Sequence, residues 1–131
     1  MAINYLAVFV AALSSFLLGA IWYGALGKVW LREIGKTGQD RGNELPTFAG
    51  FFVLALIAAF VFAMFLGPNP PLNTAVGTGV AIGAGLVTTS YGINYLFAQR
   101  SLLLFAIDGG YHTLQFTLMG LVLGLWHYNP F

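Results

Sequence analysis

The chain has 131 residues, of which 59% are hydrophobic and 7% are charged, with a net charge of +1 and a mean hydropathy of +0.84. Soluble domains carry about 25% charged residues, so a soluble protein of this composition could not cover its surface with polar groups. The absence of cysteine excludes disulfides, thiolate metal ligands and cysteine nucleophiles. We therefore predict that residues 1–131 form a single transmembrane domain.

Four apolar stretches follow one another along the chain, at about residues 4–26, 48–66, 72–97 and 102–126. As a helix with a rise of about 1.5 Å per residue, each is long enough to cross about 30 Å of hydrocarbon. None has the alternation of apolar and polar residues that is typical of membrane β-barrels. The expected fold is all-α, a bundle of four transmembrane helices.

Three connections join these stretches. The first, residues 27–46, holds four of the five Lys and Arg residues. Its beginning, KVWLREIG, mixes apolar and charged residues and is typical of a short interfacial helix. The other two, GPNPP at 67–71 and AQRS at 98–101, are short turns.

The basic residues predict the orientation of the helices in the membrane. All five lie in the first and third connections, which places loop 27–46 in the cytoplasm and both termini outside it. No basic region precedes the first apolar stretch, so we do not expect a cleaved signal peptide. The expected location is the inner membrane of a bacterium, crossed several times. Aromatic belts are expected from Trp22, Tyr23 and Trp30 on the inner side and from Tyr5, Trp126 and Tyr128 on the outer side.

Small residues recur at four-residue spacing in every apolar stretch, which allows helix backbones to approach one another closely in lipid. We expect some of these faces to pack the bundle, and a homo-oligomer is expected as well; which faces would serve a second subunit stays open. The residues expected in helix packing are Ala11, Ser15, Gly19, Gly79, Gly83, Gly120 and Gly124.

Polar residues interrupt the last apolar stretch. Asp108, Tyr111, His112 and Gln115 have the spacing i, i+3, i+4 and i+7, which places them on one face of a helix. Polar groups at this depth are costly in lipid, so this face is expected to point into the protein. Because the short turn at 98–101 makes the third and fourth helices antiparallel neighbours, Tyr91 and Asn94 are expected to join this polar cluster.

The polar cluster has three possible roles. A hydrogen-bonded or charged pair of Asp108 and His112, capped by a tyrosine, would only fix helix packing. Alternatively, these residues line a path for a proton, a cation or a small polar solute, as intramembrane Asp and His often do. The third possibility is a site for a lipid headgroup, a quinone or a pigment.

Several classes of function are not expected. His112 and His127 are fifteen residues apart with no further ligand nearby in the sequence, so no metal or haem is expected. No HExxH motif, nucleophile elbow, P-loop or dinucleotide fingerprint is present, so the chain is not expected to be an enzyme, to hold a cofactor or to bind nucleic acid.

Two regions of the sequence resemble the DUF1761 family of small bacterial membrane proteins. One is INYLAVFVAALSSFLLGAIWYG followed by GKVWLREIG, and the other is NYLFAQRSLLLFAIDGGYHTLQFTLMGLVLGLW. The resemblance covers nearly the whole chain and implies a four-helix membrane protein with no assigned activity and no known binding residues. The small-residue faces and the packing role of the polar cluster make the first expectation a structural or accessory membrane subunit that docks onto a larger complex. The alternatives are an oligomeric transporter or channel and a lipid, quinone or pigment binder.

Overall fold

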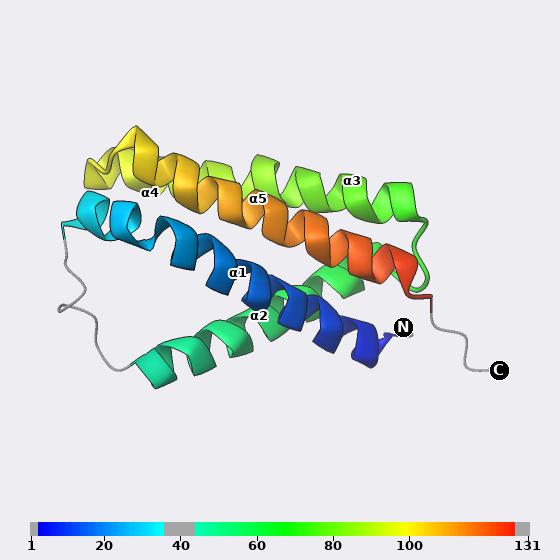
Figure 1. Cartoon of the computed structure of the whole chain (residues 1–131). Coiled ribbons are helices and arrows are strands. Elements are labelled where there is room, and N and C mark those ends of the chain that lie inside the picture. Colours follow the sequence, from blue (N-terminus) through cyan, green and yellow to red (C-terminus); the bar gives the residue numbers. More distant parts are fainter. Residues whose placement is uncertain (1–2, 36–43, 128–131) are drawn as a thin grey trace.

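The computed structural model describes residues 3–35 and 44–127, and within these ranges every regular element is helical. The turn η2 is π-helical and joins α3 to α4 without a break, so the described residues form four helices in all (Figure 1). The all-α class expected from the sequence is confirmed. The elements in chain order are α1 (Tyr5–Ile34), α2 (Glu44–Leu66), α3 (Leu72–Ile82), η2 (Gly83–Val87), α4 (Thr88–Ala98) and α5 (Leu102–Leu125).

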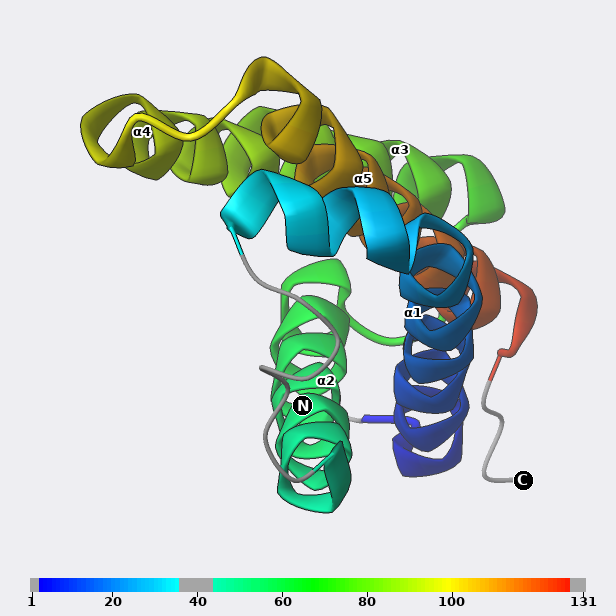
Figure 2. The same ribbon diagram turned by 60° about the vertical axis from the view of Figure 1, so that its left-hand side comes forward.

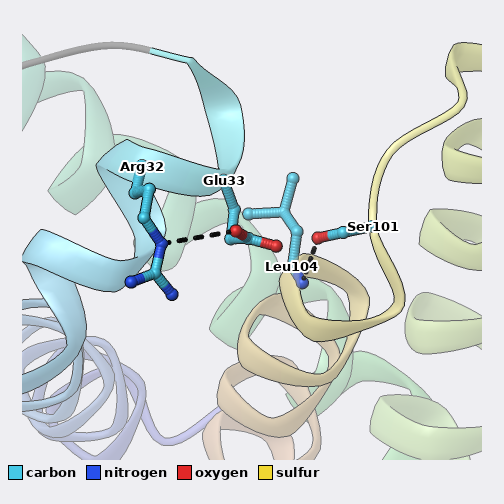
Figure 3. Close-up of polar contacts among 4 residues, drawn as sticks. All are labelled: Arg32, Glu33, Ser101 and Leu104. Carbon is cyan, nitrogen blue, oxygen red and sulfur yellow. Dashed lines mark hydrogen bonds and ion pairs between the residues drawn. The ribbon is translucent and has the colours of Figure 1, made fainter.

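The helices begin and end at residues suited to those positions. The Asn4 side chain accepts a 3.1 Å hydrogen bond from the Ala7 amide and so caps the start of α1. Gly35 ends α1 with a φ of 78°, a left-handed conformation that glycine adopts without strain. The Ser101 hydroxyl caps α5 by accepting a 3.0 Å hydrogen bond from the Leu104 amide (Figure 3).

Helix α5 lies at the centre of the fold. It runs antiparallel to the continuous helix of α3, η2 and α4, and α1 packs along its other side (Figures 1 and 2). Helix α2 packs on α1 and crosses it obliquely (Figure 1). The central position of α5 gives its polar face protein neighbours instead of an exposed surface.

By length and composition, three of the described helices are able to cross a membrane: α1, α2 and the continuous helix over Leu72–Ala98. The fourth, α5, has 24 residues but is not among them. It is less apolar because it carries Asp108, His112 and Gln115. The prediction of four apolar spans was therefore correct for three helices, and the fourth is the central, more polar one.

The two ends of the molecule are tied separately. At one end the Arg100 guanidinium donates a 3.3 Å hydrogen bond to the Ile34 carbonyl, which joins the turn before α5 to the end of α1. Figure 3 shows Arg32 and Glu33 beside the first turn of α5. At the other end the Asn4 amide donates to the Trp126 carbonyl at 3.2 Å. The described parts of the two basic connections thus share one end of the molecule; Lys36, Arg41 and Tyr128 lie outside the described residues.

Helix α1 continues through residues 27–34, which the sequence had suggested as a separate interfacial segment. With 30 residues it is about 45 Å long, more than the roughly 30 Å thickness of a bilayer core. Figure 2 shows that α1 changes direction along its length, so that its last turns run away from α2. Trp22, Tyr23 and Trp30, in the second half of α1, hydrogen-bond to α5.

Glycines bring the backbones of α3 and the start of η2 close to the backbone of α5. A Cβ atom added to Gly83 would lie 2.7 Å from the His112 carbonyl oxygen, so no other residue fits there unless the helices move apart. Cβ atoms on Gly79 or Gly120 would also meet backbone atoms of the opposite helix. Gly124 likewise lies against α3. We call these four residues the glycine seam.

The small residues of α1 are buried on the inner side of that helix. Ala11 and Ser15 are both 0% exposed, and Gly19 is buried against the Phe51 ring of α2. A Cβ atom on Gly19 would also lie 3.3 Å from the Tyr111 hydroxyl oxygen. This face of α1 therefore contacts both α2 and α5.

Candidate functional site

The Asp108 carboxylate is the centre of the most polar site inside the helices. It is 5% exposed and accepts hydrogen bonds from three aromatic side chains. The Tyr23 hydroxyl and the Trp30 indole, both on α1, donate to Oδ1 at 2.5 and 3.0 Å. The Tyr95 hydroxyl of α4 donates to Oδ2. We call these four residues the Asp108 site, and they tie α1 and α4 to α5.

Three donors suit an ionised carboxylate, which is an acceptor only. Hydrogen bonds to a charged acceptor are shorter and stronger than neutral ones, so Tyr23, Trp30 and Tyr95 together replace the water that the buried carboxylate has lost. The donors themselves are neutral, so the arrangement solvates the charge without cancelling it.

A further indole of α1 binds the backbone next to Asp108. The Trp22 indole donates a 2.9 Å hydrogen bond to the Ile107 carbonyl. The neighbouring Gly110 makes room for it, since a Cβ atom there would lie 3.0 Å from the Trp22 ring. Gly109 makes room for α4, because a Cβ atom at this position would lie 2.6 Å from the Thr88 methyl carbon. The two glycines that weaken the α5 pattern thus allow its neighbours to approach.

A second set of hydrogen bonds runs along α5 and ends on α1. The Gln115 amide oxygen only accepts, so Nδ1 of His112, 2.7 Å away, carries the proton. In the neutral ring Nε2 then accepts from the Tyr91 hydroxyl at 3.1 Å. The Gln115 amide nitrogen donates to the Ser15 hydroxyl at 2.8 Å.

This set of bonds closes on a backbone group. The Ser15 hydroxyl lies 3.2 Å from the Tyr111 hydroxyl, which donates to the Ser15 carbonyl at 2.9 Å. Tyr91, His112, Gln115, Ser15 and Tyr111 therefore form one continuous series, which we call the His112 series. Its last acceptor is a peptide oxygen that has no proton to pass on.

The π-helical turn decides which face of α4 meets α5. Gly79 and Gly83 contact α5, and an uninterrupted α-helix would next bring Ser90 and Asn94 to that side. A π-helical turn holds one additional residue and rotates everything after it. In the structure Asn94 is accordingly exposed.

Thr88 closes the π-helical turn. Its hydroxyl oxygen lies 2.7 Å from the Gly83 carbonyl and 3.0 Å from the Gly109 carbonyl, within donating distance of both. The rotation after η2 brings Tyr91 to the His112 series and Tyr95 to the Asp108 site.

The structure places the predicted residues in two sites instead of one cluster. Tyr111, His112, Gln115 and Tyr91 all belong to the His112 series. Asp108 belongs to the other site, so the Asp108–His112 pair, one of the three roles considered for the cluster, is not formed: the two side chains have separate partners. The prediction for Asn94 was wrong, because the π-helical turn puts Tyr95 on the inner face in its place.

Three residues of α1 that contact α5 were not expected in the polar cluster. From their place near the end of an apolar stretch, Trp22, Tyr23 and Trp30 are predicted as part of an interfacial belt, whereas in the structure all three hydrogen-bond to α5. The spacing of Tyr23 and Trp30, i and i+7 on one helical face, was the available signal. Among the described residues, no group of three or more His, Cys, Asp and Glu side chains forms a metal site.

A groove between α1 and α2 lies next to the Asp108 site. Its volume is about 700 Å³, and its lining includes Tyr23 and Trp30, the two donors from α1. A smaller pocket of about 140 Å³ lies at the other end, near Asn4 and Trp126. Neither pocket is lined by Asp108 or His112.

Comparison with known proteins gives one match. The family model described as "Protein of unknown function (DUF1761)" matches residues 6–124. No curated protein and no solved structure matches the chain. Every residue of the Asp108 site and of the His112 series lies inside the matched range.

Proposed function

We propose a role for this chain, which belongs to the DUF1761 family. In this role it is a small integral membrane protein that acts as a structural or accessory subunit and not as an enzyme. No activity is assigned to the family, so the proposal rests on the polar interior of the helices. In this role the Asp108 site and the His112 series hold α1, α4 and α5 in one arrangement.

The observation that carries this proposal is the saturation of the buried polar groups. Among the described residues, no buried side-chain nitrogen or oxygen lacks a hydrogen-bond partner. A transport path needs groups that can exchange partners with water or a solute, whereas interhelical hydrogen bonds that are all made inside the protein stabilise packing. The end of the His112 series on the Ser15 carbonyl supports the same role.

We place the protein in the inner membrane of a bacterium, with both termini outside the cytoplasm. Support comes from the hydrogen bond between Arg100 and Ile34, which places the described parts of the two basic connections at the same end of the molecule. Basic residues concentrate on the cytoplasmic side of a membrane. The proposed partners are the lipid bilayer and either further copies of the chain or a larger membrane complex, with no nucleic acid.

The test is purification of the tagged protein in mild detergent after cross-linking in its own membrane. A structural or accessory subunit is expected to come with a larger membrane protein, or with copies of itself, in a fixed ratio. Purification as a monomer that alone conducts ions or protons in liposomes would contradict the proposal.

The second candidate is a transporter or channel with a proton- or cation-linked path along Asp108 and His112. It is favoured by the placement of these two ionisable groups one helical turn apart inside the fold. In this case Asp108→Asn is expected to abolish flux in liposomes while the protein still folds. Equal flux through the unchanged protein and Asp108→Asn would show that Asp108 is not part of the path.

A further inference from the structure

The two walls of the groove between α1 and α2 are lined by different kinds of residue, and its rim is charged. Its volume of about 700 Å³ falls within the range of ligand pockets, about 300–1,000 Å³. Phe48 and Phe51 of α2 form an apolar wall. The opposite wall on α1 combines large side chains, among them Tyr23 and Trp30, with four small residues. The small residues are Gly19, Ala20, Gly24 and Gly27.

Two charged residues line the groove, Lys28 of α1 and Glu44 at the start of α2. Lys28 lines the groove and is exposed, and its side chain makes no ion pair with the described residues. Arg32, one turn further on, pairs with Glu33 at 3.6 Å. Glu44, the acidic residue in the lining, is engaged in an interaction of its own. Among the described residues that line the groove, Lys28 is the cation that can contact a ligand.

We propose that this groove binds one anionic phospholipid, with an acyl chain between the two walls and its phosphate at Lys28. The inference rests on the proposed insertion of the protein into a bilayer. In that setting an apolar groove that opens beside α1 and α2 is filled by the apolar molecules around it, and water has few partners there. Lys28 lies near the end of α1 that carries the basic residues, where the phosphates of that leaflet are found.

The Asp108 site argues for an acyl chain and against a ring with polar substituents. Tyr23 and Trp30 line the groove, but their hydroxyl and indole N–H groups donate to Asp108. They offer the groove the apolar parts of their rings only. A quinone or pigment headgroup would need those donors, whereas an acyl chain needs none. A bound lipid thus packs behind the two donors and supports them against α5.

The first test fills the groove by substitution. In Gly24→Leu the new side chain enters open space, because no heavy atom lies within 4 Å of the added Cβ atom, and Gly24 lines the groove. Gly50→Leu is the matched control: its surroundings are equally open, and it is exposed on α2 away from the groove lining. Both proteins are reconstituted in nanodiscs of equimolar phosphatidylglycerol and phosphatidylcholine and then released for native mass spectrometry.

The unchanged protein and Gly50→Leu are expected to retain one phosphatidylglycerol per chain, and Gly24→Leu to lose it. Lys28→Gln is expected to lower the preference for the anionic lipid about fivefold, which corresponds to one basic residue near a membrane surface. Arg32→Gln, which removes a cation already paired with Glu33, is the control and keeps most of the preference.

Two results would overturn the lipid site. One is equal lipid retention by Gly24→Leu and Gly50→Leu; the other is a lipid-free dimer that Gly24→Leu disrupts, since a second copy would then occupy the groove. Failure of the unchanged protein to enter the nanodisc would instead refute the proposed membrane role. Entry without selective retention refutes the lipid site alone.

Discussion

Tyr23 of α1 and Asp108 of α5 are 85 positions apart in the chain, and their side chains meet in a 2.5 Å hydrogen bond. The bond joins the second half of α1 to the central helix. Because its acceptor is a buried carboxylate, removal of either partner costs more than the loss of an ordinary surface hydrogen bond. The Asp108 site is therefore the first place to test the packing of the fold.

Asp108→Ala is expected to lower the free energy of unfolding by about 3 kcal/mol or more, because three partly buried donors lose the buried acceptor that they share. Tyr23→Phe removes one donor and should cost about 1.5–3 kcal/mol. Unfolding with sodium dodecyl sulfate in mixed micelles, followed by circular dichroism, measures both. Tyr5→Phe is the control, because Tyr5 is exposed and stacks on Phe60 through its ring, and it should change nothing. Equal stabilities of Tyr23→Phe and Tyr5→Phe would refute the role of the Asp108 site.

The glycine seam is expected to tolerate no added methyl group. Gly79→Ala should destabilise the protein by about 1–3 kcal/mol or prevent folding, because the methyl group meets the backbone of α5. Gly77→Ala, two residues away, has open space around it and should stabilise α3 by up to about 1 kcal/mol through helix propensity. The same unfolding titration compares them. Similar effects of the two substitutions would mean that α3 and α5 do not touch at the seam.

The π-helical turn is expected to align Tyr95 with Asp108. Deletion of Leu86, an exposed residue of η2, should restore an α-helical register and rotate Tyr95 away from α5. Tyr95→Phe should then destabilise the full-length chain but have almost no effect in the deletion variant, which a double-mutant cycle measures. Leu86→Ala, which keeps the length of the turn, serves as control. An undiminished effect of Tyr95→Phe in the deletion variant would contradict the register shift.

The proposed orientation can be tested with single cysteines because the chain has none of its own. Leu102→Cys and Asn73→Cys place thiols at exposed positions at opposite ends of the fold. In intact cells, a maleimide that cannot cross the membrane should label Asn73→Cys only, and Leu102→Cys should react after the cells are opened. Labelling of both from outside would contradict the membrane arrangement.

The spacing of residues on α5 was enough to predict one polar face, and in the structure Asp108, Tyr111 and Gln115 are at most 5% exposed. A helical period of 3.6 residues and the cost of polar groups in lipid determine such a face without knowledge of its neighbours. The glycines at four-residue spacing could be recognised for the same reason. The polar face and the spaced glycines can each be recognised from the sequence of a single helix.

What could not be predicted depends on how two helices are placed relative to one another. The partners of Asp108 on α1 lie in the second half of that helix, which changes direction along its length (Figure 2), and no residue pattern indicated this change. The position of Asn94 depended on the register after η2, where the single additional residue of a π-helical turn changes every later position. Apolar composition gave no sign of that turn, since the sequence GAGLV of Gly83–Val87 is equally compatible with a continuous α-helix.

All three donors to Asp108 precede it in the chain. Ribosomes deliver residues from the N-terminus onward, so Tyr23, Trp30 and Tyr95 are synthesised before the acid that they bind. On its own, α5 would carry a carboxylate into the hydrocarbon at a cost of about 2.5–3.5 kcal/mol. In the proposed membrane insertion the donors are synthesised first, so the acid can enter beside partners that are already present, and the order of the sequence would thereby ease the insertion of α5.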